Sequence, residues 1–160
     1  MNLTLFWTCF IITPHNTSEI KPDILSTDTH GVNHVNFALL DLFGYQFAPR
    51  YAQFSTVISD LFDVSDGEDN KVTLSLKKPI NTTLIINEWD TIQHIVISLQ
   101  QKTITQATLV RKLSGYSKNY PLLKALTEYN RMLKAMYLLD YIDDASLRGY
   151  VQRALNRGEA

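Results

Sequence analysis

The sequence contains one cysteine, few glycines and prolines, and neither an internal repeat nor a low-complexity tract. The single Cys9 excludes an intramolecular disulfide and any zinc site built from several cysteines, and a chain of this kind is expected in a reducing cytoplasm. The 6 glycines and 5 prolines among 160 residues are therefore expected to mark individual turns and helix ends.

The sequence also lacks the patterns that are typical of a membrane-spanning helix and of a signal peptide. Residues 3–12 are mostly apolar, but no Lys or Arg precedes them and no small-x-small cleavage pattern comes before Pro14. The run is also shorter than the roughly 20 residues that a membrane-spanning helix needs. We expect neither secretion nor membrane insertion.

The amount of apolar sequence predicts a folded domain, or part of one. Hydrophobic residues make up 45% of the chain and charged residues 19%, which is enough to bury a sizeable core. Residues 1–100 carry 5 Lys and Arg against 11 Asp and Glu, whereas residues 101–160 carry 10 against 5. The basic second part is compatible with contacts to nucleic-acid phosphates. From composition alone, the solvated faces of ordinary amphipathic helices are the more common explanation.

The stretch Ser-Thr-Asp-Thr-His-Gly at residues 26–31 is the starting point for predicting a functional site. It follows the apolar pair Ile24 and Leu25, which reads as a short strand. A carboxylate released at the end of a strand, here Asp28, is in a position suited to a metal ligand. The spacing alone also fits a polar turn, in which Asp28 caps neighbouring backbone N–H groups and Gly31 supplies a positive φ.

Downstream, the pattern predicts a helix over 33–43 ended by Gly44, a short strand over 45–48 ended by Pro49, and a strand over 72–76. The acidic run at 63–71 lacks the spacing of a calcium-binding loop and is predicted to be a solvated loop. Four further helices are expected over 87–99, 105–115, 121–140 and 143–155, with Asn87, Thr105 and Asp143 or Asp144 as caps and Pro121 at a helix start. The predicted class is α/β and mainly helical.

One of these helices carries Arg111 and Lys112 beside a second short helix. Basic residues in that setting could form a DNA-reading helix pair. Short helix pairs are common in any helical domain, so the same residues also fit a solvated helix surface.

Three ordered motifs resemble the C-terminal catalytic region of transposases from the class II replicative transposons, the Tn-three family. They are Thr-Asp-Thr-His-Gly at 27–31, Gly-Tyr-Gln-Phe-Ala-Pro-Arg at 44–50 and Arg-Gly-Glu-Ala at 157–160. The likeness covers the chain from about Asp23 to its end. It implies a DDE-type catalytic domain over 23–160, preceded by an atypical segment over 1–22, and a partial RNase H-like fold with a helical insertion around 87–140.

The resemblance also implies the chemistry and the residues that perform it. The family cleaves and joins DNA by two-metal phosphoryl transfer, with two aspartates and a glutamate holding Mg²⁺. Asp28 corresponds to the second aspartate and Glu159 to the glutamate, so both are expected to be catalytic metal ligands. His30, Gly31, Arg50 and Arg157 are neighbouring motif or DNA-contact candidates, together with Arg111 and Lys112. Arg50 suits a bidentate phosphate contact, and a structural ion pair to an acid fits equally well.

The family's first aspartate has no convincing counterpart in residues 1–27, and the chain stops one residue after Glu159. The resemblance therefore implies a fragment that is inactive alone, with DNA and possibly other transposase subunits as partners, in the bacterial cytoplasm or at the nucleoid. The alternative is a helical module that binds DNA or transposase without catalysis. Composition alone would also fit a helical protein of unrelated purpose.

Overall fold

A computed structural model describes residues 24–27, 36–66, 72–101, 103–104, 106–115, 117 and 119–158. The described residues form mainly helices with two small two-stranded sheets, as the pattern predicts. In chain order the elements are β1 (Ile24–Leu25), α2 (Asn36–Leu42), β2 (Gln46–Phe47), α3 (Phe54–Leu61), β3 (Phe62–Asp66), β4 (Val72–Leu76), α4 (Thr82–Asn87), α5 (Trp89–Gln100), α6 (Gln106–Gly115), α7 (Pro121–Asp143) and α8 (Ala145–Gly158).

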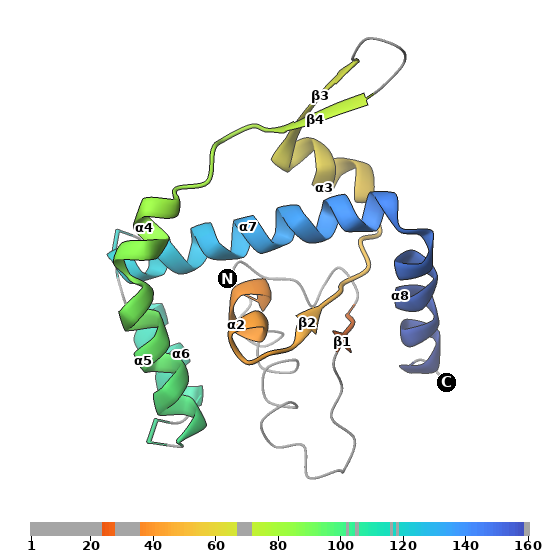
Figure 1. Ribbon diagram of the computed structural model, residues 1–160. Coiled ribbons are helices and arrows are strands. Elements are labelled where there is room, and N and C mark those ends of the chain that lie inside the picture. The colour runs from red at the N-terminus through yellow and green to blue at the C-terminus, as the bar shows by residue number, and fades with distance from the viewer. Residues whose placement is uncertain are drawn as a thin grey trace.

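Helix α7 is the axis around which the other elements pack (Figure 1). Its first residue is the predicted Pro121, and its 23 residues correspond to a length of about 35 Å at 1.5 Å per residue. Helices α4, α5 and α6 lie at its N-terminal end, and α8 leaves its C-terminal end. The pair β1–β2 and helix α2 lie on one side of α7, with α3 and the β3–β4 hairpin on the other.

The main hydrophobic core joins the strand pair to the C-terminal half of α7 and to α8. Its aromatic centre is Phe37, whose ring lies 4.9 Å from the ring of Phe47 and 5.6 Å from that of Tyr137. Such edge-on and tilted ring contacts add to the stabilisation from apolar burial. The buried members of this cluster are Phe37, Leu40, Phe47, Ala48, Tyr51, Ile58, Phe62, Ala135, Tyr137, Leu138 and Val151.

A second cluster holds the helices at the other end of α7. Ile92 of α5, Leu109 of α6 and Leu126 of α7 are its buried centre. Beside it, the Trp89 ring meets the Tyr129 ring edge-on at 5.6 Å.

A third buried cluster of Ala38, Ile85 and Tyr129 lies between these two: Leu133 packs against both it and the main cluster, and Trp89 packs against both it and the second cluster. The packing is therefore continuous along α7.

The segment from β1 to β2 forms a parallel βαβ unit with α2 as the connection. Ile24 pairs with Gln46 and Leu25 with Phe47. Gly44 ends the helical segment with a φ of 80°, a left-handed conformation that glycine adopts without strain. The predicted strand, helix and glycine stop are confirmed here, whereas residues 33–35 of the predicted helix lie outside the described residues.

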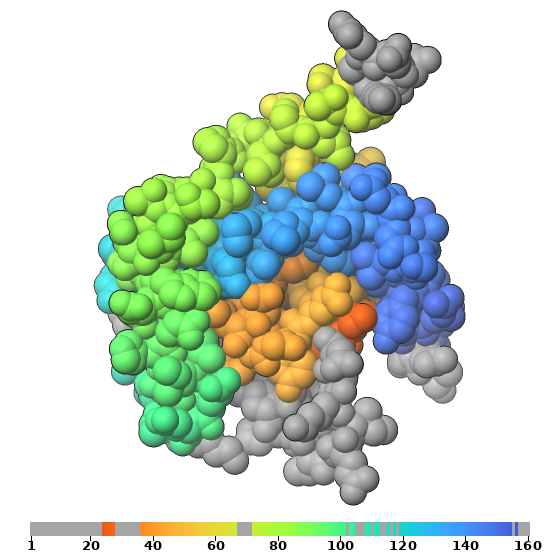
Figure 2. Space-filling view, in the orientation of Figure 1, coloured from red at the N-terminus to blue at the C-terminus, as the bar shows by residue number. Residues whose placement is uncertain are grey.

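The prediction of a solvated loop over 63–71 is wrong for its first part. Residues 62–66 form β3, which pairs antiparallel with the predicted strand β4, from Phe62 opposite Leu76 to Asp66 opposite Val72. Backbone pairing tolerates the acidic side chains because they are exposed to solvent. Figure 2 shows the hairpin projecting from the body of the molecule.

Two helices were not predicted, and one predicted cap is wrong. Helix α3 contains several β-branched residues, and α4 begins at Thr82, earlier than the predicted helical start at Asn87. The cap of α4 is Asn81, whose side-chain oxygen accepts a 3.0 Å hydrogen bond from the backbone N–H of Leu84. Asn87 is the last residue of α4. The predicted cap Thr105 lies outside the described residues.

Candidate functional site

Two of the sequence motifs meet at the ends of the parallel strands β1 and β2. The Ala48 N–H donates to the Leu25 carbonyl at 2.8 Å, and the Arg50 N–H donates to the Thr27 carbonyl, also at 2.8 Å. The alternating bonds continue the parallel pattern beyond the two assigned strand residues. Thr27 is the first residue of the motif at 27–31, and Arg50 is the last residue of the motif at 44–50. The start of one motif therefore lies beside the end of the other in space.

Helix α7 holds the same segment from its other side. The Tyr137 hydroxyl donates a buried 2.7 Å hydrogen bond to the Pro49 carbonyl. Burial raises the pKa of Tyr137 well above its ordinary value, so the phenol keeps its proton at neutral pH and remains a donor. The backbone of Pro49 and Arg50 is therefore held by two hydrogen bonds, one to the Tyr137 side chain of α7 and one to the Thr27 carbonyl that follows β1.

Helix α8 reaches this segment through a polar side chain that sequence analysis did not single out. Arg50 donates from its guanidinium Nη1 to the amide oxygen of Gln152 at 3.2 Å. Gln152 in turn donates from Nε2 to the side-chain oxygen of Asn156, one helical turn further along, at 2.9 Å. A row of polar side chains thus runs from the end of β2 along α8 toward its C-terminus.

The start of α8 is fixed by Asp144, one of the two predicted caps. Its carboxylate accepts hydrogen bonds from the Ser146 hydroxyl at 2.5 Å and from the Ser146 backbone N–H at 2.7 Å. These bonds, the hydroxyl bond first, lower the pKa of Asp144 below its ordinary value.

Several of the predicted site residues lie outside the described part of the chain. They are Asp28, His30, Gly31 and Glu159. The description stops at Thr27, directly before Asp28, and again at Gly158, directly before Glu159. The assignments of these four residues remain predictions.

The predicted basic residues fall into two separate places. Arg50 is half-buried at the strand ends, and Arg157 is in the last turn of α8. Arg111 and Lys112 are exposed on α6, which lies near the opposite end of α7 from α8 (Figure 1). The structure therefore does not bring the α6 cations to the strand ends.

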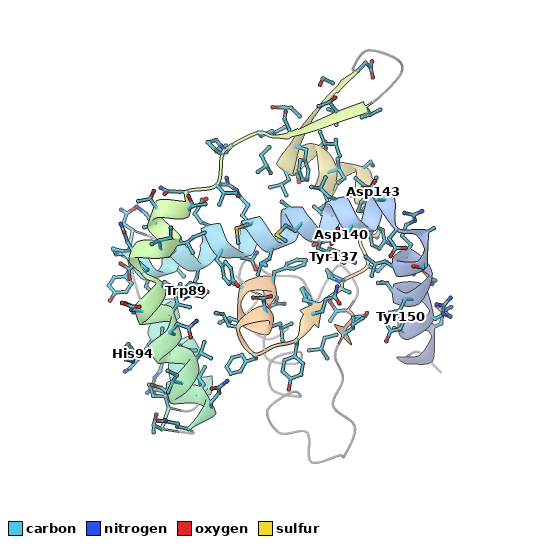
Figure 3. All side chains as sticks on the ribbon, in the orientation of Figure 1. Trp89, His94, Tyr137, Asp140, Asp143 and Tyr150 are labelled. Carbon is cyan, nitrogen blue, oxygen red and sulfur yellow. The ribbon has the colours of Figure 1, made fainter. Side chains whose placement is uncertain are left out.

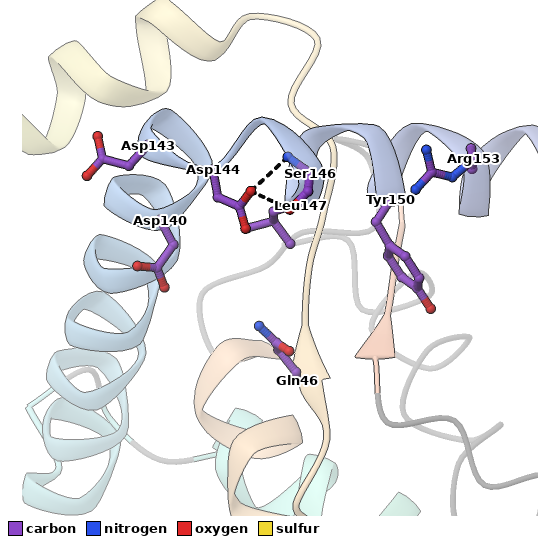
Figure 4. Close-up of a pocket in the computed structure, with 8 residues that line it drawn as sticks. All are labelled: Gln46, Asp140, Asp143, Asp144, Ser146, Leu147, Tyr150 and Arg153. Carbon is purple, nitrogen blue, oxygen red and sulfur yellow. Dashed lines mark hydrogen bonds between the residues drawn. The ribbon is translucent and has the colours of Figure 1, made fainter.

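A pocket of about 510 Å³ lies where α7 turns into α8 (Figure 4). Three of its lining residues are aspartates, and the one basic residue among them is Arg153. Asp140 and Asp143 project to different sides of the turn, and Asp144 is engaged by Ser146. Figure 3 shows two of these aspartates, Asp140 and Asp143, near the C-terminal end of α7. The acidic lining disfavours a DNA phosphate here. The residues of this pocket are Gln46, Asp140, Asp143, Asp144, Ser146, Leu147, Tyr150 and Arg153.

Among the described residues, no group of three or more His, Cys, Asp and Glu side chains could hold a metal ion. Asp28 and Glu159 are not among those residues. As carboxylates they provide the hard oxygen ligands that Mg²⁺ prefers, so their chemistry fits that ion.

Sequence analysis missed Gln152, Asn156 and Tyr137 as parts of the site. The four-residue spacing of Gln152 and Asn156 on a predicted helix was a signal that they share a face. The ring of Tyr137 is buried in the core, and no sequence signal indicates that its hydroxyl donates to the Pro49 carbonyl.

Comparisons with known proteins show that both motifs lie within one matched family domain. The family model described as Tn3 transposase DDE domain matches residues 10–160. The chain belongs to this family. It is 37% identical over 154 residues to the transposase for transposon Tn2501 of Escherichia coli, and 33% identical over 147 residues to that for transposon Tn1546 of Enterococcus faecium. Each alignment covers 91% of this chain and 15% of the relative.

The transposase for transposon gamma-delta of Escherichia coli strain K12 is 33% identical over 141 residues, covering 88% of this chain and 14% of that protein. The chain thus spans about one-seventh of the length of these relatives. No solved structure matches it. DDE-type transposases use divalent metal ions. In the described part of the chain, no helix is both long enough and apolar enough to span a membrane.

Proposed function

We propose that this chain is the part of a replicative transposase that contributes two of the three catalytic carboxylates. The observation that carries the proposal is the hydrogen bond from Arg50 to Thr27, which brings two family motifs to the ends of two parallel strands. Catalytic residues are often placed where parallel strands end. The βαβ unit is compatible with the expected RNase H-like fold.

Asp28 and Glu159 are the proposed metal ligands, and Mg²⁺ is the proposed ion. Two such ions stabilise the attacking and leaving oxygens of an in-line phosphoryl transfer. The side chain of Asp28 would follow directly from the strand ladder at Thr27, and Glu159 follows α8, which is tied to that ladder through Arg50 and Gln152. The contacts between Arg50 and its neighbours therefore support bringing the two carboxylates together.

The substrate in this proposal is DNA, at transposon ends and at the target. Arg50 and Arg157 would contact phosphates near the carboxylates, and His30 and Gly31 would complete the motif around Asp28. A planar guanidinium such as that of Arg50 can contact a phosphate through two parallel hydrogen bonds. The first catalytic aspartate would come from another part of a transposase or from another subunit, so the chain alone would not cleave DNA. The place of action would be the bacterial cytoplasm, at the nucleoid.

A second candidate function follows from the position of α6. Arg111 and Lys112 are exposed near the end of α7 that is remote from the strand ends. Contacts of these cations to DNA would not need the metal site. A module that binds DNA without catalysis is therefore the alternative.

A chimaeric transposase tests the proposal. Residues 23–160 would replace the matching segment of the Tn2501 transposase, and strand cleavage at transposon ends would be measured with Mg²⁺. We expect cleavage by the chimaera, loss of cleavage with Asp28→Asn, and nearly unchanged DNA binding, because the substitution removes a ligand charge and not a phosphate contact. Cleavage that persists in Asp28→Asn would contradict the assignment.

A chimaera that binds transposon ends but never cleaves them, with Asp28 intact, would favour the alternative. A matched control is Asp63→Asn, because Asp63 is exposed on the projecting hairpin. This variant should cleave like the unsubstituted chimaera.

A further inference from the structure

The β3–β4 hairpin has one apolar face and one polar face. Residues directly opposite each other in an antiparallel pair lie on the same side of the sheet, and successive residues of a strand lie on opposite sides. The register of the hairpin therefore sorts its residues into two sets. The apolar face is made of Phe62, Val64, Val72, Leu74 and Leu76 with Asp66 at its outer end, and the polar face is made of Asp63, Ser65, Thr73 and Ser75.

The apolar face is buried at the base of the hairpin and exposed at its outer end. Phe62 is 3% exposed, and Leu74 packs against the main cluster. Val64 and Val72 are 56% and 63% exposed, in the hairpin that projects from the body of the molecule (Figure 2). A two-stranded hairpin is only marginally stable by itself, and exposed apolar surface with a polar rim is typical of an interaction site.

The backbone of β4 presents hydrogen-bonding groups along its outer edge. The Lys77 N–H donates to the Leu61 carbonyl at 3.0 Å, one residue beyond the last strand pair. Because hydrogen-bonded pairs alternate with non-bonded pairs in an antiparallel ladder, the odd-numbered residues of β4 bond to β3. The even-numbered residues, Val72, Leu74 and Leu76, therefore direct their N–H and C=O groups to the outer edge. No third strand pairs with this edge in the part of the chain that the structure describes.

The two outer edges of the hairpin differ in charge. Strand β3 carries two exposed aspartates, Asp63 and Asp66, and charged side chains oppose the addition of another strand. Strand β4 itself has no charged residue, and two exposed lysines, Lys77 and Lys78, follow it directly. The β4 edge is therefore the edge that is open to pairing.

We propose that the β4 edge pairs with the β4 edge of a second copy of this chain, antiparallel about a two-fold axis, to form a four-stranded sheet. Antiparallel pairing places Lys77 and Lys78 of each copy near the outer end of the other hairpin, where Asp66 lies opposite Val72. The two edges are therefore complementary in charge and in their alternating apolar side chains. The contact is small, so it belongs to the weak class of interfaces that bury less than about 1,200 Å². This inference goes beyond the proposed function and does not depend on the metal site.

The test is the weight-average mass of the 160-residue chain, measured by sedimentation equilibrium over a series of protein concentrations. We expect the mass to rise with concentration from 18.3 kDa toward twice that value. Val72→Pro removes an outward N–H at the first residue of β4, where an edge strand tolerates proline. It should raise the dissociation constant at least about ten-fold, because each substitution occurs twice in a two-fold contact. Ile86→Lys is the matched control, since Ile86 is 71% exposed on α4, and it should leave the dissociation constant unchanged.

A charge exchange tests the orientation of the pair. Asp66→Lys and Lys78→Glu should each raise the dissociation constant at least about four-fold, because each substitution places like charges near one another at both ends of the contact. Their combination restores opposite charges, so its dissociation constant should lie within about two-fold of that of the unsubstituted chain. Single-variant losses that add in the combination would overturn the antiparallel arrangement.

Amide hydrogen exchange, followed by NMR, provides a measurement that needs no substitution. We expect the Thr73 and Ser75 amides to be protected at every concentration, and the Leu74 and Leu76 amides to become protected only as the chain associates. Leu74 and Leu76 amides that stay unprotected in the associated chain would overturn the inference.

Two results of the mass measurement would also overturn it. One is a mass that stays at 18.3 kDa at every concentration. The other is association that Val72→Pro weakens no more than the Ile86→Lys control does. None of these results bears on strand cleavage by the chimaera, so failure of this inference and failure of the proposed function are distinguishable.

Discussion

The backbone N–H of Arg50 donates a 2.8 Å hydrogen bond to the carbonyl of Thr27, across 23 residues of sequence. The bond joins the last residue of one family motif to the first residue of another. It is a backbone contact, so it depends on the strand register and not on either side chain. The register in turn follows from the burial of Phe47 beside Phe37 in the main core.

Tyr137→Phe should lower the free energy of unfolding by about 1–3 kcal/mol, because the Pro49 carbonyl would stay buried without its donor. Urea unfolding followed by circular dichroism measures this change. Tyr150→Phe is the matched control, since Tyr150 is 47% exposed. It should change the stability by less than about 0.5 kcal/mol. Equal effects of the two substitutions would show that the Tyr137 hydroxyl does not stabilise the strand ends.

The Asp144 cap predicts an acid-dependent loosening of α8. Its pKa is lowered in the folded chain, so the stability it contributes is complete above its ordinary value of 3.8 and is lost as the pH falls through the lower native value. An NMR titration of the Asp144 carboxyl carbon should give a pKa below 3.8. Ser146→Ala should raise that pKa toward the ordinary value, because the hydroxyl bond is its largest cause. An unchanged pKa in Ser146→Ala would contradict this account of the cap.

The double substitution Arg111→Gln with Lys112→Gln tests whether α6 contacts DNA. If both cations meet phosphates, binding to duplex DNA should weaken, and the slope of log affinity against log salt concentration should fall by about 1.8. Lys77→Gln with Lys78→Gln removes the same charge from exposed positions just after β4, and serves as the control. The same loss in both double variants would indicate a nonspecific charge effect and no α6 interface.

Local sequence signals predicted the elements that depend on local physics. Gly44 ends the helical segment with a positive φ, Pro121 begins α7, and Asp144 caps α8, because each needs only its immediate neighbours. Helix α3 was missed because its β-branched residues have low helix propensity, while burial of Ile58 favours the helix in the folded chain. Met136 continues the apolar spacing of α7 but is 56% exposed, so helical spacing alone does not identify which apolar residues are buried.

The candidate site was predictable from the sequence only in part, because sequence patterns report local structure and not contacts between distant segments. The carboxylates and Arg50 were found through motifs, which are local in sequence. The partnership of Arg50 with Gln152 spans 102 residues and depends on how α8 packs against the core, which no single-sequence pattern contains.

The most direct test of the central claim is whether Asp28 binds the metal ion at the meeting point of the two motifs. Mn²⁺ titration of the 160-residue chain would be followed by NMR in the unsubstituted protein, in Asp28→Asn and in the Asp63→Asn control. The account predicts selective broadening of the Thr27 and Arg50 amide signals in the unsubstituted chain and in Asp63→Asn, and its loss in Asp28→Asn. Broadening of these signals that persists unchanged in Asp28→Asn would contradict it.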